Sequence, residues 1–173
     1  ILIDYSKAGI NRISFGIQDF NKKVGKAINR THTFEEIKIL LTDNVREKFR
    51  SINFDLLYGL PFQTLDSLKK TLEIISWLKP TRLAYYSFQH RPDLYRHQTA
   101  INSVNLPDIE LKNAMNLLIQ DELKKLNYKK LGLDHYINED DYYYKDLILK
   151  KNIERNAIGY SPKTSHNIIG IGP

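Results

Sequence analysis

Cysteine is absent from all 173 residues of the chain. This absence excludes disulfides, thiolate metal sites and iron–sulfur clusters bound by cysteines of this chain. Long hydrophobic runs are missing too, since no apolar stretch approaches the ~20 residues that a membrane span needs. Ile1-Leu2-Ile3 is interrupted by Asp4, so no signal peptide is predicted. We therefore expect a cytoplasmic protein without a membrane span.

The composition is typical of one globular domain, with 42% hydrophobic and 27% charged residues. The net charge of +6 fits either an anionic ligand or a mildly basic surface. Lysines and arginines form no stripe with interleaved aromatic residues, so we expect no nucleic-acid partner. The five histidines lack the i, i+4 spacing of a zinc-binding helix, so we expect no metal site. A monomer is the expected state.

Strand-like and helix-like segments alternate along the chain in the order typical of a parallel sheet. The pattern predicts strands at 12–18, 51–57, 82–88 and 128–133, and helices at 20–29, 33–45, 64–80, 107–126 and 141–151. The polar stretch 91–105 is expected to be a functional loop. A complete eight-stranded α/β barrel takes ~250 residues, so the chain is expected to hold only part of one, with an exposed apolar interior. The predicted fold class is α/β.

Polar residues follow three of the predicted strands: Gln18 with Asp19, Asp55, and Gln89 with His90. The carboxyl-terminal strand ends form the active face of barrel folds, so we expect these side chains at one rim. Asp55 lies between large apolar neighbours, where a carboxylate needs a partner. The alternative is a structural carboxylate that caps a helix or accepts hydrogen bonds from the backbone.

Several motifs, in order along the chain, carry a resemblance to a known family. They are Asn11-Arg12-Ile13-Ser14-Phe15-Gly16-Ile17-Gln18-Asp19-Phe20, Asn29-Arg30, Asn53-Phe54-Asp55-Leu56-Leu57-Tyr58-Gly59-Leu60-Pro61, Gly132-Leu133-Asp134-His135-Tyr136, Arg155-Asn156, Gly159-Tyr160 and Gly170-Ile171-Gly172. Together they resemble the oxygen-independent coproporphyrinogen III oxidases of the radical SAM superfamily. The Asp-Leu-Leu-Tyr-Gly-Leu-Pro segment also resembles the related haem chaperones, whereas Gln18-Asp19-Phe20 with Asn29-Arg30 favours the oxidases.

The resemblance implies a partial (β/α) barrel of radical SAM type over residues 1–105. Residues 106–173 would form the C-terminal part of the same catalytic domain, as a helix, a strand and a helix, truncated at its end. The implied reaction is the oxidative decarboxylation of coproporphyrinogen III to protoporphyrinogen IX in porphyrin biosynthesis. It uses two S-adenosylmethionine molecules, a [4Fe-4S] cluster and an electron donor. The family's cluster cysteines precede the matched region, so we expect this chain alone to be inactive.

The resemblance also implies roles for individual residues. Gln18, Arg30 and Asp55 match family positions that contact the second S-adenosylmethionine. Gln89 is a further candidate for contacting this cofactor, but it stands where the family usually has alanine, so a longer side chain is expected to crowd the ligand there. His90 and His135 are candidates to contact substrate propionates. Two alternatives stay open: a non-catalytic haem- or tetrapyrrole-binding relative, similar to the haem chaperones, and the inactive remnant of a decayed gene.

Overall fold

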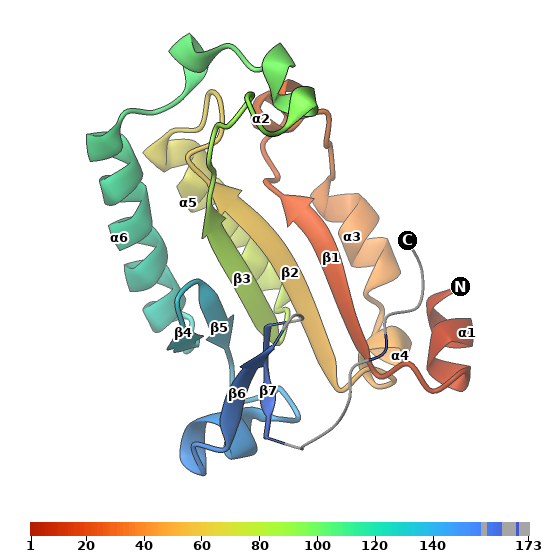
Figure 1. The fold of residues 1–173 in the computed structure, drawn as a ribbon. Coiled ribbons are helices and arrows are strands. Elements are labelled where there is room, and N and C mark those ends of the chain that lie inside the picture. Colours follow the sequence, from red (N-terminus) through yellow and green to blue (C-terminus); the bar gives the residue numbers. More distant parts are fainter. Residues whose placement is uncertain (157–158, 164–168, 170–173) are drawn as a thin grey trace.

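The computed structural model describes residues 1–156, 159–163 and 169, and shows one central sheet flanked by helices (Figure 1). The five-stranded sheet has the order β1-β2-β3-β5-β4, and β6 and β7 form a separate hairpin. The motif Gly170-Ile171-Gly172 and the end of the segment 106–173 lie outside the described residues. The helices are α1 (Leu2–Lys7), α2 (Lys22–Ala27), α3 (Phe34–Leu40), α4 (Asp43–Arg46), α5 (Leu65–Leu78) and α6 (Ile109–Lys125). The strands are β1 (Arg12–Gln18), β2 (Ser51–Tyr58), β3 (Arg82–Ser87), β4 (Lys129–Gly132), β5 (His135–Ile137), β6 (Ile153–Asn156) and β7 (Gly159–Pro162).

The first three strands are parallel and confirm the predicted strands 12–18, 51–57 and 82–88. Arg12 is the register partner of Ser51, and Asn53 is the register partner of Arg82. Each connection between them contains helices, as parallel strands require. The expectation of an α/β fold with a largely parallel sheet is therefore confirmed.

Side-chain caps fix where the connecting helices begin. Thr33 and Glu36 form the predicted capping box at the start of α3. Thr64 accepts a hydrogen bond from the Ser67 backbone at the start of α5. That helix ends at Lys79, which adopts a left-handed conformation directly before Pro80. The caps predicted from the sequence thus set the boundaries of both helices.

The segment after α6 differs from the prediction. Residues 128–133 do contain a strand, β4, but it pairs antiparallel with β5, and β5 pairs antiparallel with β3. The parallel order therefore does not extend to it. The prediction of a helix at 141–151 is wrong, because within this range the structure has only a short π-helix, at Lys145–Leu149. The loop 91–105 contains two 3-10 turns, at Arg96–Ala100 and Ser103–Asn105.

The two faces of the sheet have opposite character. On one face lie Phe54, Leu56, Leu83 and Tyr85, which are buried together with apolar residues of α3, α5 and α6. The alternate residues on the other face are mainly polar, and the hairpin β6–β7 lies over this face near the amino-terminal ends of the parallel strands (Figure 1). The expectation of an exposed apolar interior is therefore wrong. We call this second side the open face.

Within the part of the chain that the structure describes, no helix is both long and apolar enough to cross a membrane.

Candidate functional site

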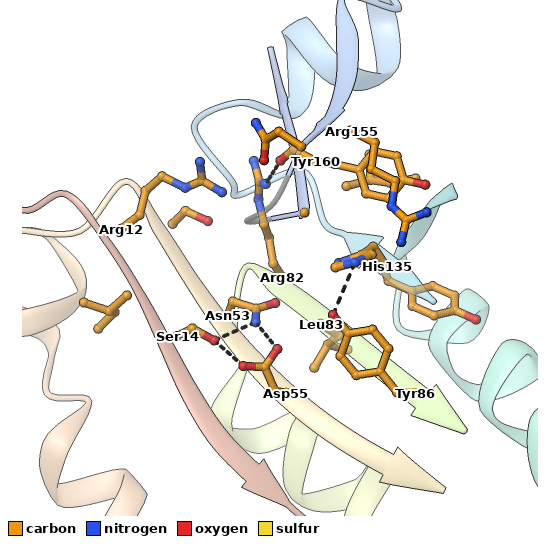
Figure 2. A pocket seen from close by; sticks show the side chains of 16 residues that line it. Arg12, Ser14, Asn53, Asp55, Arg82, Leu83, Tyr86, His135, Arg155 and Tyr160 are labelled. Atoms are coloured by element: carbon orange, nitrogen blue, oxygen red, sulfur yellow. Dashed lines mark hydrogen bonds between the residues drawn. The ribbon is translucent and has the colours of Figure 1, made fainter. Parts of the chain in front are cut away.

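A cavity of about 430 Å³ lies between the open face of the sheet and the hairpin β6–β7 (Figure 2). Ligand pockets commonly have volumes of this order. Its lining residues are Arg12, Ile13, Ser14, Ser51, Asn53, Asp55, Arg82, Leu83, Tyr86, Leu131, His135, Tyr136, Arg155, Asn156, Gly159 and Tyr160. Asp55 and His135 are the residues from the sequence-based candidates that line it. The cavity therefore lies over the amino-terminal and middle parts of the strands, and Gln18, Gln89 and His90, expected at the carboxyl-terminal rim, do not line it.

Asp55 lies on the open face, in the middle of β2, and its carboxylate is half-buried. The Ser14 hydroxyl donates to Asp55 Oδ2 over 2.6 Å, and the Asn53 amide donates to Asp55 Oδ1 over 2.9 Å. Figure 2 shows these three side chains as a triangle at one end of the cavity. Because the observed donors are side chains on neighbouring positions, this arrangement differs from a helix cap or a carboxylate held by the backbone.

Gln18, at the end of β1, and Arg30, in the segment after α2, lie close to Gly16 but do not line the cavity. Gly16 is the register partner of Asp55, and the strand register shifts between Gly16 and Gln18. Gln18 has a φ of 68°, a bulge geometry that redirects its side chain. A Cβ atom placed on Gly16 would lie 3.2 Å from Gln18 Nε2 and 3.6 Å from Arg30 Nη1. The missing side chain of Gly16 thus leaves space beside the Gln18 amide and the Arg30 guanidinium, on the strand position that is paired with Asp55.

Gln89 and His90 lie on the segment after β3, outside the cavity lining. Gln89 is exposed, and its amide is 3.4 Å from Ser87 Oγ. His90 Nε2 is 3.3 Å from the carbonyl oxygen of Gln98, and its ring stacks on Phe88. The structure does not bring these two residues together with Asp55.

His135 is held in the cavity wall by two tyrosines. Its Nε2 is 3.4 Å from the Tyr86 hydroxyl, and its ring packs edge-on against Tyr160 with 5.1 Å between centroids. Burial lowers the pKa of His135, while the carboxylates of Asp134 and Asp55 oppose that shift. The net shift favours the neutral form of the ring.

Arg82 is a structural member of the cavity wall. Its guanidinium makes a two-point contact with the buried Asp141, at 3.0 Å and 3.1 Å, and donates to the carbonyl oxygen of Tyr160 over 2.8 Å. Thr81 also donates to Asp141, over 2.9 Å. This group joins β3 to the segment 138–144 and to the hairpin, so the charge of Arg82 is already compensated.

Asp19, beside Gln18, is a structural carboxylate. It is buried and accepts hydrogen bonds from the Asn21 backbone, from Gln63 Nε2 over 2.6 Å and from Thr71 Oγ1 over 3.2 Å. These hydrogen bonds lower the pKa of Asp19, but burial outweighs them, so the net pKa is raised. Asp19 therefore links the loop after β1 to the loop after β2 and to α5.

Sequence reasoning missed most of the cavity lining, including Arg12, Tyr86 and Arg155. A signal was present in the strands, because polar residues recur at every second position. Arg12 and Ser14 do so in β1, and Ser51, Asn53 and Asp55 do so in β2. Period-two spacing places such residues on one face of a sheet. Arg155 and Tyr160 carry no comparable signal, since only the path of the chain brings their hairpin over this face.

The chain's residues fit one implied cofactor and not the other. An iron–sulfur cluster of this type is bound by cysteine thiolates, and the chain has no cysteine, so its residues do not fit a cluster. S-adenosylmethionine carries a carboxylate, an ammonium group and ribose hydroxyls. An arginine, a carboxylate and an amide beside the bare Cα of Gly16 are matching partners for these groups.

Comparisons with known proteins agree with the fold and the motifs. A family model described as the radical SAM superfamily matches residues 1–75. An oxygen-independent coproporphyrinogen III oxidase of Helicobacter pylori is 38% identical over 95% of this chain and 36% of its own length. The corresponding protein of Pseudomonas aeruginosa is 35% identical over 95% of this chain and 35% of its own length. The chain thus spans about a third of the length of these curated relatives.

A solved structure gives the same result. The coproporphyrinogen III oxidase HemN of Escherichia coli, described as a radical SAM enzyme, is 33% identical and superposes with a TM-score of 0.89. The match covers 99% of this chain and 39% of that protein. These matches confirm the resemblance that the motifs predicted: residues 1–75 match the radical SAM model, and the chain is similar over nearly its whole length to a segment of oxygen-independent coproporphyrinogen III oxidases.

Proposed function

We propose that this chain forms the S-adenosylmethionine-binding and substrate-facing part of an oxygen-independent coproporphyrinogen III oxidase. In that reaction, two propionates of coproporphyrinogen III are oxidatively decarboxylated to vinyl groups in porphyrin biosynthesis. The observation that supports the proposal is the position of Asp55. Its half-buried carboxylate stands on the open face of the sheet as the register partner of Gly16, and the side chains of Gln18 and Arg30 lie within 4 Å of the Cβ position of Gly16.

Each of these three side chains suits a group of S-adenosylmethionine. Arg30 donates to the carboxylate, because a guanidinium offers paired donors to two oxygens. Asp55 accepts from the ammonium group or a ribose hydroxyl, in addition to its bonds with Ser14 and Asn53. Gln18 supplies both a donor and an acceptor. When bound, S-adenosylmethionine supplies the radical chemistry of the family, and these residues orient it.

The 173 residues alone do not start this chemistry, since they offer no thiolate to a cluster. A complete enzyme needs cluster cysteines from outside this sequence, together with an electron donor. Gln89, which the sequence suggested as an obstacle to the ligand, lies outside the cavity lining and is exposed. We therefore propose that Gln89 is neutral for binding.

Equilibrium dialysis of the folded chain against labelled S-adenosylmethionine tests the cofactor role. Asp55→Ala and Arg30→Gln should each weaken binding about tenfold or more, because each removes a charge-assisted contact worth about 1.5–3 kcal/mol. Asp66→Ala is the control, because it removes an exposed carboxylate from the first turn of α5. Absence of binding by the folded wild-type chain, or equal losses in the control, would contradict the proposal.

A second function, a non-catalytic haem-binding protein, is favoured by His135 and by the lack of cysteine. Burial lowers the pKa of His135 and so favours the neutral ring, which is the form that binds haem iron. Titration with haem separates the two functions. A Soret shift that disappears in His135→Ala, in a chain that does not bind S-adenosylmethionine, would favour haem binding.

A further inference from the structure

Two arginines in the cavity wall lack the compensation that Arg82 has. Arg82 is paired with Asp141, but neither Arg12 nor Arg155 makes an ion pair among residues 1–156, 159–163 and 169. The segments outside that description contain no Asp or Glu in the sequence. Both arginines line the cavity, Arg12 from β1 and Arg155 from β6. The cavity therefore has two walls that each present an arginine without an ion pair among the described residues.

The environment of Arg12 makes its charge costly in the free protein. The side chain is half-buried, and its guanidinium lies 5.6 Å from the centre of the Tyr143 ring. Burial and the nearby charge of Arg82 lower the pKa of Arg12, and Asp141 opposes this only in part. Figure 2 shows its guanidinium directed toward Arg82 and Tyr160, at the end of the cavity away from Asp55. A bound anion would relieve this cost, since it supplies the missing counter-charge.

We propose that Arg12 and Arg155 bind carboxylates of a tetrapyrrole, one from each wall of the cavity. This inference rests on the proposed function, which supplies a ligand with several propionates. The cavity separates two kinds of chemistry, because Asp55 with Ser14 and Asn53 lies at one end and Arg12 lies at the other (Figure 2). S-adenosylmethionine also carries a carboxylate. Arg30 lies beside Gly16, the register partner of Asp55, so we assign the cofactor carboxylate to Arg30 and a substrate propionate to Arg12.

Fluorescence titration of the full chain with coproporphyrin III, the stable oxidised form of the substrate, tests this proposal. Arg12→Gln should weaken binding about tenfold, the size expected for one charge-assisted hydrogen bond. Arg155→Gln should weaken it by a smaller factor, because Arg155 is exposed. The tetramethyl ester of coproporphyrin III should bind equally to wild type and both variants, since it has no carboxylate.

Arg50→Gln is the matched control. Arg50 also lies over a tyrosine, 4.6 Å from the centre of the Tyr142 ring, but it does not line the cavity. It should leave coproporphyrin affinity unchanged. Circular dichroism checks the fold of each variant, and Arg155→Gln decides the question if Arg12→Gln does not fold. Equal losses in Arg50→Gln, or unchanged affinity in both cavity variants, would overturn the proposal.

A second measurement on the same variants is their affinity for S-adenosylmethionine. Arg12→Gln should leave it unchanged, whereas a loss of this ligand alone would reassign Arg12 to the cofactor carboxylate and overturn the propionate assignment. A wild-type chain that binds S-adenosylmethionine but not coproporphyrin overturns this inference and leaves the cofactor role intact. A chain that binds neither ligand fails the proposed function as well.

Discussion

The two faces of the central sheet come from alternate residues of the same strands, yet they have different tasks. The helix-covered face contains Phe54, Leu56 and Tyr85, all nearly inaccessible to solvent. The open face contains Asp55 and Tyr86, which keep contact with solvent and a cavity. Burial of apolar area stabilises the fold, whereas polar groups left at a cavity are available to a ligand. We therefore expect stability to depend mainly on the helix-covered face and the proposed binding to depend on the open face.

The largest expected effect is on the helix-covered face. Phe54→Ala should lower the free energy of unfolding by about 3–5 kcal/mol, because it leaves a cavity in the core and removes the edge-on contact with Phe15. Asn53→Ala, the neighbouring position on the open face, should cost about 1 kcal/mol for its hydrogen bonds. Urea unfolding followed by circular dichroism measures both values. Equal losses would show that the faces do not divide the tasks.

Much of the parallel half of this fold could be predicted from local sequence. The strands 12–18, 51–57 and 82–88 carry apolar residues between turn and cap signals, and Thr33 and Thr64 mark helix starts that the structure confirms. Such signals act within a few residues, so they are readable without the fold.

The segments after α6 depend on distant contacts instead. The direction of β5 is set by its pairing with β3, and Leu133 adopts a φ of 35° in the turn before it. The predicted helix at 141–151 is absent because Asp141 binds Arg82 and Thr81, and the Tyr142 backbone donates to the Arg50 carbonyl. No local pattern encodes these long-range contacts.

The residues of the candidate site likewise include some that local sequence predicts and some that only the fold brings together. The sequence pointed to Asp55 through its apolar neighbours, and to His135 through its motif, and both line the cavity. Gln89 and His90 lie elsewhere because the chain leaves the sheet after Ser87. Arg155 reaches the cavity on a hairpin whose position the sequence alone does not predict. Strand spacing can therefore place residues on a face, but not the elements that cover that face.

An intermediate effect is expected at Asp19, which joins the loops at the carboxyl-terminal end of the sheet. Asp19→Asn should cost about 1–3 kcal/mol, the penalty for an unsatisfied buried group. The new amide would face either the Gln63 amide or the Asn21 backbone N–H, which are both donors. Gln63 cannot turn over freely, because its oxygen accepts from the backbones of Gly59 and Leu60.

The same residue gives the chain a pH dependence. The folded pKa of Asp19 is raised from 3.8, so the stability that it contributes is full below that value and is lost as pH rises through the folded pKa. Urea unfolding at pH values between 4 and 7 measures the slope. Asp19→Asn should lack this part of the slope, whereas the exposed Asp43→Asn in α4 should keep it. An unchanged slope in Asp19→Asn would contradict the assignment.

A smaller effect is expected at His135, which lies on the open face beneath the hairpin. If this face is partly enclosed by the hairpin, His135 should titrate below its ordinary pKa of 6.5, because burial disfavours the charged ring. Tyr160→Ala removes the ring that covers His135 and should raise that pKa. Asp55→Ala should lower the pKa further, because the Asp55 carboxylate favours the charged ring.

Nuclear magnetic resonance of the His135 ring protons as a function of pH measures these shifts. Because the folded pKa is lowered, the stability linked to His135 is present above pH 6.5 and is lost as pH falls through the folded value. Shifts of opposite sign in Tyr160→Ala and Asp55→Ala would show that the hairpin and the β2 carboxylate act on one enclosed site. Shifts of the same sign, or none, would mean that the hairpin does not cover the open face in solution.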